Sequence, residues 1–174
     1  MLEKLCSELS NLNPQDYDSL PDIELYMDQV LEYISKTPIS FSSEDKITSA
    51  MVNNYIKAGL VPRANGKKYD KRHFVNLLII ARLKQVLSVK YMNTLFESIF
   101  SENGEKEYYE KFRAMLNTCC EDAVKKLSNT DVELSALALK FAVESYVNKV
   151  VSEYILDMIF IEKDSEETSK SKEK

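Results

Sequence analysis

The fifteen residues Thr48–Pro62, TSAMVNNYIKAGLVP, contain the clearest structural signals of the chain. Thr48 or Ser49 can cap a short helix here, because a side-chain hydroxyl accepts hydrogen bonds from the free amides of a first helical turn. The helix predicted over 48–58 ends at Gly59, since the residue after a helix often needs a positive φ. The stretch therefore predicts a brief helix with a defined start and end.

Residues 63–70, RANGKKYD, follow immediately. Asn65-Gly66 is a strong signal for a two-residue hairpin turn, so we expect two very short strands around it. Asp70 can cap the next helix, whose apolar residues lie on both sides and predict that it is buried. A short helix followed by a basic hairpin is the arrangement of a winged helix-turn-helix, with the hairpin over 63–69 as its wing.

Helical periodicity extends outward from this centre in both directions. We predict helices from Leu2 to Leu12, from Asp22 to Ile34, from Ser88 to Ile99, over 105–127 and over 131–162, with a polar connector from Ser35 to Lys46. Residues 163–174 contain no apolar residue, which is typical of a disordered tail. We divide the chain into an N-terminal part over 1–104, whose winged core spans about 22–100, and a C-terminal helical region over 105–162.

Composition agrees with a mainly α fold. The 174 residues include only 3 Gly and 4 Pro, too few for the many turns of an all-β sandwich or for glycine-rich nucleotide loops. The 3 Cys do not have the spacing of a zinc site and indicate reduced thiols. The single histidine, His73, is expected to be exposed at a helix start without a catalytic or metal-binding role. No nucleophile–base pair or phosphate loop is visible. We therefore expect a protein that is not an enzyme and has no cofactor or metal.

Charge is unevenly distributed. The chain carries a net charge of -5, yet residues 47–90 contain nine basic residues and one acidic residue, Asp70. Six of the nine lie between Lys57 and Arg72. Clustered lysine and arginine are typical of surfaces that contact phosphates, because neutralising phosphates releases counterions. A solvated charged face is the plainer interpretation, and the predicted hairpin favours the phosphate interpretation over it.

The candidate DNA-binding residues fall into two groups. Thr48, Ser49, Asn53 and Asn54 belong to the short helix, where asparagine can read adenine in the major groove. Contacts to phosphates are expected from Lys57, Arg63, Lys67, Lys68, Tyr69, Lys71 and Arg72. Tyr69 also fits a core aromatic that fixes the wing. The core should contain Tyr55, Leu60, Phe74, Leu78 and Ala81, and the aromatic cluster Tyr108, Tyr109 and Phe112 should pack on the last helix or form a pocket or dimer surface.

Thr48–Pro62 resembles the recognition helix and turn of MerR-type regulators, and Gly66–Asp70 resembles their wing. The wider stretch Leu20–Phe100 is similar to a bacterial family known as domain of unknown function 1836. The MerR resemblance implies a winged helix-turn-helix that binds DNA. Asn53 stands where MerR-type proteins usually carry arginine, and Lys67 replaces the wing arginine, which keeps the charge but loses the bidentate fork.

Together these features predict a bacterial, cytoplasmic DNA-binding transcription regulator that acts as a homodimer on double-stranded DNA. The recognition helix would enter the major groove while the wing lies on the backbone. The N-terminus shows no signal peptide, and charges within Leu134–Ile161 argue against a membrane span. The alternative is a protein-interaction module whose degenerate winged helix no longer binds DNA and docks an acidic partner instead.

Overall fold

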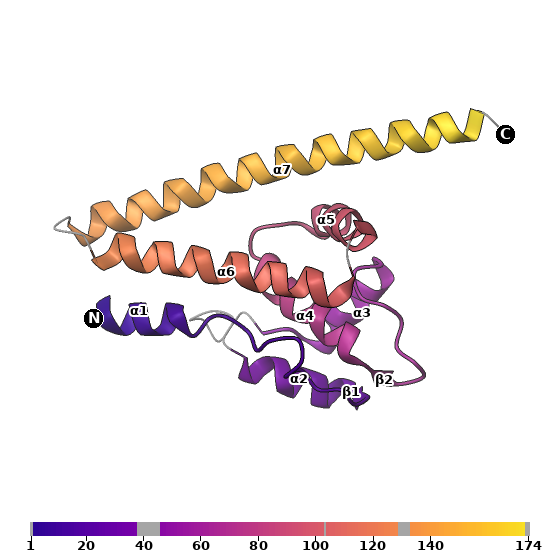
Figure 1. Ribbon diagram of the computed structural model, residues 1–174, viewed down its shortest axis with the longest axis horizontal. Coiled ribbons are helices and arrows are strands. Elements are labelled where there is room, and N and C mark those ends of the chain that lie inside the picture. The colour runs from indigo at the N-terminus through magenta and orange to yellow at the C-terminus, as the bar shows by residue number, and fades with distance from the viewer. Residues whose placement is uncertain (1, 38–45, 103, 129–132, 173–174) are drawn as a thin grey trace.

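The structure, a computed structural model, describes residues 2–37, 46–102, 104–128 and 133–172. Within these ranges the chain is mainly helical and has one small antiparallel sheet (Figure 1). The elements are α1 (Leu2–Ser10), β1 (Leu25–Tyr26), α2 (Met27–Lys36), α3 (Ser49–Lys57), β2 (Lys68–Tyr69), α4 (Lys71–Leu83), α5 (Val89–Glu102), α6 (Glu105–Ser128) and α7 (Leu134–Lys172). The predicted connector falls mostly on residues 38–45, which lie outside the described residues.

Helix α4 is the centre of the core. Every residue from His73 to Ala81 is buried, and α2, α6 and β2 all pack against this helix. The prediction of a buried fourth helix is confirmed, as is the core position of Tyr55 and Leu60. Apolar residues on both sides of a helix require neighbours on both sides, and the surrounding elements provide them.

The start of α4 corrects one expectation. Asp70 Oδ1 accepts a hydrogen bond from the His73 amide, and the Asp70 amide donates to His73 Nδ1 at 3.0 Å. His73 is only 4 % exposed, and the edge of its ring meets Tyr69 at 5.1 Å between ring centroids. The prediction that His73 is exposed was therefore wrong, because its imidazole closes a reciprocal cap with Asp70.

The segment before α2 is extended, although a helix was predicted from Asp22. Leu25 pairs with Tyr69 and Tyr26 pairs with Lys68 in the antiparallel sheet. Helix α2 begins only at Met27. The amide of Tyr26, the residue just before it, donates a hydrogen bond to Gln29 Oε1 in the first turn. Pairing with β2 gives the backbone groups of Leu25 and Tyr26 the hydrogen-bond partners that a helix would otherwise provide. Helix α2 therefore starts five residues later than predicted.

The aromatic cluster of α6 packs against several elements of the core. Tyr109 donates to the Gln15 carbonyl at 2.9 Å and meets Tyr17 edge-on, while Tyr108 meets Phe96 of α5. The cluster therefore joins α6 to the segment after α1 and to α5. It also shares one core with Leu156 and Ile159 of α7, which agrees with the predicted packing on the last helix.

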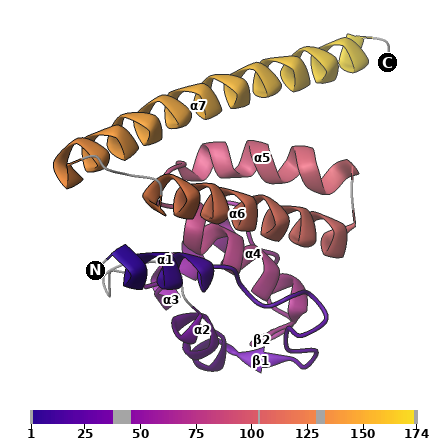
Figure 2. The same ribbon diagram turned by 60° about the vertical axis from the view of Figure 1, so that its left-hand side comes forward.

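Helix α7 forms one side of the molecule, and α2 with the two strands forms the opposite side (Figure 2). Helix α7 contacts α5 and continues to Lys172. The prediction of a disordered tail from residue 163 was therefore wrong for residues 163–172. Lysine and glutamate are good helix formers, so a polar sequence can extend a helix that apolar residues have started. No helix within the described ranges has both the length and the hydropathy that crossing a membrane requires.

Candidate nucleic-acid interface

Helix α3 presents a polar face to solvent because its apolar residues turn inward. Val52 and Tyr55 are buried, while Ser49, Asn53 and Lys57 are exposed. A spacing of four residues places these three exposed side chains in one row along the helix. Thr48 and Asn54 are exposed as well. The structure therefore brings the helical candidates onto the accessible side of α3.

Both ends of α3 are fixed by polar contacts. Thr48 Oγ1 accepts a hydrogen bond from the Met51 amide at 3.3 Å, which confirms the predicted cap. At the other end Gly59 has φ +82, a backbone conformation that residues with a side chain rarely adopt. The Leu60 amide then turns back to the Tyr55 carbonyl at 2.9 Å. The predicted end of the helix at Gly59 is confirmed.

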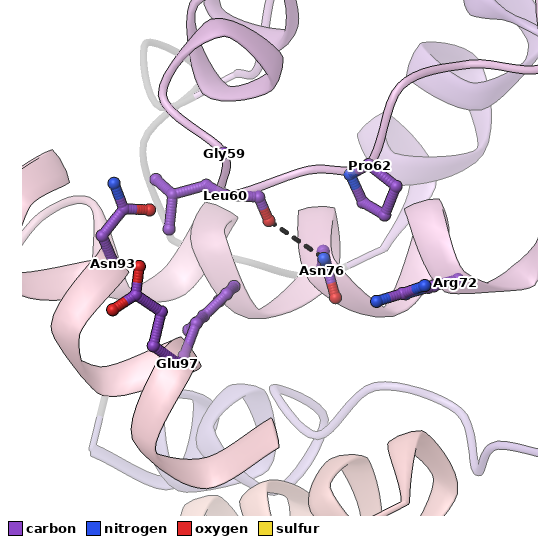
Figure 3. Close-up of a pocket in the computed structure, with 8 residues that line it drawn as sticks. Gly59, Leu60, Pro62, Arg72, Asn76, Asn93 and Glu97 are labelled. Carbon is purple, nitrogen blue, oxygen red and sulfur yellow. Dashed lines mark hydrogen bonds between the residues drawn. The ribbon is translucent and has the colours of Figure 1, made fainter. Parts of the chain in front are cut away.

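Two asparagines that the sequence reasoning missed hold this turn on the helices beneath it (Figure 3). Asn76 of α4 donates through Nδ2 to the Leu60 carbonyl at 2.9 Å, and Asn93 of α5 donates to the Ala58 carbonyl at 2.6 Å. Asn76 is only 4 % exposed. A signal was present, since Asn76 is the one polar residue between Phe74 and Ala81.

The predicted hairpin is reduced to a tight turn. Asn65 and Lys68 exchange both backbone hydrogen bonds at 3.0 Å, so Gly66 and Lys67 are the central residues, one position later than expected. Gly66 has φ +62, as the first central position of a type II′ turn requires. The arm before the turn contributes one bridge, and the strand after it pairs with β1 instead.

Four of the candidate residues around this turn are tied into the fold. Lys68 lies 3.5 Å from Glu24, and Arg72 lies 3.9 Å from Glu105. Lys71 is half-buried, 3.8 Å from Asp22 and with its ammonium 5.0 Å from the ring centre of Tyr17. Tyr69 is 6 % exposed and packs on His73, and burial raises the pKa of its hydroxyl. These residues stabilise the base of the turn.

Three basic residues remain outward: Lys57, Arg63 and Lys67 are exposed and form no ion pair with any carboxylate in the described ranges. The start of α3 and the turn meet in a hollow of about 520 Å³. The residues that line it include Ser49 of α3, Lys67 of the turn, and Tyr26 and Asp28 of the β1–α2 segment. The structure thus joins the helix and the turn across one concave surface.

Arg82 also belongs to the basic segment, but its guanidinium bonds to backbone carbonyls within the fold. It donates to the carbonyls of Leu78 and Leu12 at 2.9 and 3.0 Å, and burial lowers the pKa of its guanidinium to about 10. Among the residues that the structure describes, no three His, Cys, Asp or Glu side chains gather where they could hold a metal ion.

Comparisons with known proteins give one match. No curated protein and no solved structure matches the chain. A family model described as "Domain of unknown function (DUF1836)" matches residues 15–115, which is more than half of the 174 residues and includes α3, the turn and both anchoring asparagines. The match does not extend to MerR-type regulators, so that resemblance stays a prediction. The chain belongs to the DUF1836 family.

Proposed function

We propose that this protein binds double-stranded DNA through α3 and the Asn65–Lys68 turn, as a winged helix-turn-helix transcription regulator. The observation that supports this most is the exposed polar row of α3, whose first residue, Ser49, lines a hollow together with Lys67 of the turn. In the proposed complex α3 enters the major groove and the turn lies on the flanking backbone.

The proposal assigns different tasks to different residues. Asn53 and Asn54 read base edges, because asparagine offers a donor and an acceptor to adenine. Lys57, Arg63 and Lys67 contact phosphates, which position the protein without reading sequence. Lys68 and Arg72 join them once phosphate displaces Glu24 and Glu105, since exposed ion pairs contribute only about 0–1 kcal/mol. Tyr69 and Lys71 keep the turn in place.

The internal ion pairs favour a second candidate function. Glu24, Asp22 and Glu105 each lie close to a cation of the candidate surface and reduce its positive potential. A protein-interaction module that docks an acidic partner needs less positive charge than a DNA-binding surface. In that case the chain would not bind duplex DNA.

A salt titration separates the two functions. Binding to a random-sequence duplex should weaken as salt rises, with log affinity falling against log salt at a slope between about -3 and -5 for three to six phosphate contacts. Lys67→Ala combined with Lys68→Ala should weaken binding to all duplexes alike and make the slope shallower by about 2. No binding at low salt would reject the DNA proposal in favour of the interaction module.

Two comparisons complete this experiment. Lys111→Ala combined with Lys125→Ala removes the same charge from exposed positions on α6 and should leave the slope unchanged. Asn53→Ala should relax the preference at one base position, at a cost of about 1–3 kcal/mol on the preferred sequence. If Asn53→Ala and the Lys67 and Lys68 double variant both bind as the parent does, the assignment of the surface is wrong.

A further inference from the structure

A small hollow lies between the turn that ends α3 and the two helices that hold this turn. It has a volume of about 250 Å³ (Figure 3). Its lining comes from the turn, from α4 and from α5, and includes Leu60 and Pro62, Arg72 and Asn76, and Phe96 and Glu97 in that order. A spacing of four residues places Arg72 and Asn76 on one side of α4. The side of α4 that holds the turn therefore also presents a charged group to the hollow.

One polar atom at this hollow lacks a partner. Asn76 is 4 % exposed and donates through Nδ2 to the Leu60 carbonyl, but no group in the described ranges donates to its Oδ1. Figure 3 shows this oxygen on the side of the amide away from Leu60, toward the end of Arg72. A buried acceptor without a donor is costly. The Asn76 oxygen therefore calls for a donor that the described chain does not provide.

Two opposite charges border the same hollow. The Arg72 side chain is 62 % exposed and the Glu97 side chain is 70 % exposed, so both can turn toward a ligand. Their ion pairs in the described part of the chain are with other residues: Arg72 lies 3.9 Å from Glu105, and Glu97 lies 3.9 Å from Lys163. These distances are too long for a hydrogen bond, and surface ion pairs of this kind are weak. A ligand with better geometry can replace both.

The groups around the hollow specify the charge of a ligand. Asn76 Oδ1 and the Glu97 carboxylate accept hydrogen bonds, so they require a donor such as an ammonium group. The Arg72 guanidinium donates and matches a carboxylate with two parallel N–H groups. A purely anionic ligand would repel Glu97 and leave the Asn76 oxygen without a donor, while a purely cationic ligand would repel Arg72. A small molecule with both an ammonium and a carboxylate group satisfies all three residues.

We infer that this hollow binds a free α-amino acid with a small apolar side chain. The carboxylate of the ligand binds Arg72, and its ammonium group donates to Glu97 and to Asn76 Oδ1. Its side chain lies against Pro62 and Phe96, which line the same space. A volume of about 250 Å³ limits the ligand to a molecule of this small size. The site adds a second binding function to the proposed one and does not rest on it.

The first test is calorimetric titration of the full chain with L-alanine and with L-valine, in the absence of DNA. At least one of the two should bind. Analogues that keep only one charged end should bind about tenfold more weakly or worse, because each loses a charge-assisted contact. These analogues are propionate and ethylamine for L-alanine, and isovalerate and isobutylamine for L-valine. Binding of neither amino acid, or equal binding of an analogue with one charged end, overturns the inference.

Two substitutions test the assigned residues. Arg72→Gln and Glu97→Gln should each weaken the binding of the amino acid about tenfold or more, because each removes one of the two charges that face the ligand. Both side chains are exposed, so the helical circular dichroism spectrum should be unchanged. Lys111→Gln and Glu107→Gln remove the same charges from an ion pair on α6 and should leave binding unaltered. Parental affinity in both the Arg72 and the Glu97 variant would overturn the site.

A nuclear magnetic resonance titration places the ligand without changing the protein. The side-chain amide signal of Asn76 should shift as the amino acid is added, because its oxygen gains a donor. The matching signal of Asn53, which is exposed on α3, should not move. Binding that leaves the Asn76 signal in place would show that the amino acid binds elsewhere and would overturn the inference.

Discussion

The buried side-chain amide of Asn76 helps to fix the position of α3 in the candidate surface. Asn76 lies on α4 among apolar neighbours, and its one recorded hydrogen bond goes to the Leu60 carbonyl, sixteen residues earlier. Leu60 follows directly after the last turn of α3 and is 1 % exposed. A buried carbonyl without a partner is costly, so this bond specifies where the chain must turn after the helix. The residue therefore acts on α3 without belonging to the exposed surface.

Asn76→Ala should destabilise the fold by about 1–3 kcal/mol, since the Leu60 carbonyl would lose its donor in a buried site. The free energy of unfolding in urea measures this loss. Asn53→Ala provides the matched control, because it removes the same amide from an exposed position on α3 and should change stability by less than about 0.5 kcal/mol. Equal effects of the two changes would show that the Asn76 bond contributes nothing.

At the scale of elements, the start of α4 gives the protein a pH-dependent contribution to stability. Partial burial opposes ionisation of Asp70, yet the hydrogen bonds that its carboxylate accepts at the start of α4, foremost from His73, outweigh burial and lower the pKa of this carboxyl below its usual 3.8. A lowered folded pKa means that the stabilisation is fully present above the unfolded value and is lost as the pH falls through the folded value.

Asp70→Asn tests this cap, because asparagine keeps a capping oxygen but does not titrate. Between about pH 5 and pH 2 the free energy of unfolding of the variant should fall less steeply than that of the parent. Chemical denaturation at a series of pH values gives both curves. Parallel curves over this interval would show that Asp70 contributes no titrating stabilisation.

Sequence reasoning predicted the elements that carry strong local signals. Thr48, Gly59 and Asp70 marked the ends of α3 and the start of α4 correctly, because each residue satisfies a backbone requirement at its own position. Strand β1 was missed because two residues are too few for any periodicity, and its existence depends on β2, more than forty residues later. The ion pairs at the base of the turn were missed for the same reason: the partners of Lys68, Lys71 and Arg72 lie far away in the sequence.

At the scale of the whole molecule, basic and acidic residues are unevenly distributed along the sequence. The segment 47–90 holds nine of the 23 basic residues, while the remaining chain holds all but one of the 28 acidic residues. Helix α7 lies on the side opposite β1 and β2 (Figures 1 and 2). Asp22, Glu24 and Glu105 nevertheless lie beside cations of the segment 47–90, so the separation of charge along the sequence is only partial in space.

If the protein binds DNA as proposed and does so as a homodimer, it should recognise a two-fold symmetric site. Duplexes selected from a random pool by the parent protein should contain two inverted half-sites, spaced by one or more turns of DNA at about 34–36 Å each. A chain that binds as a monomer should instead select a single half-site and show about half the salt dependence, because one basic surface releases half as many counterions. Selection of a single half-site by the parent protein would show that one copy of the chain binds DNA alone and would contradict the homodimer.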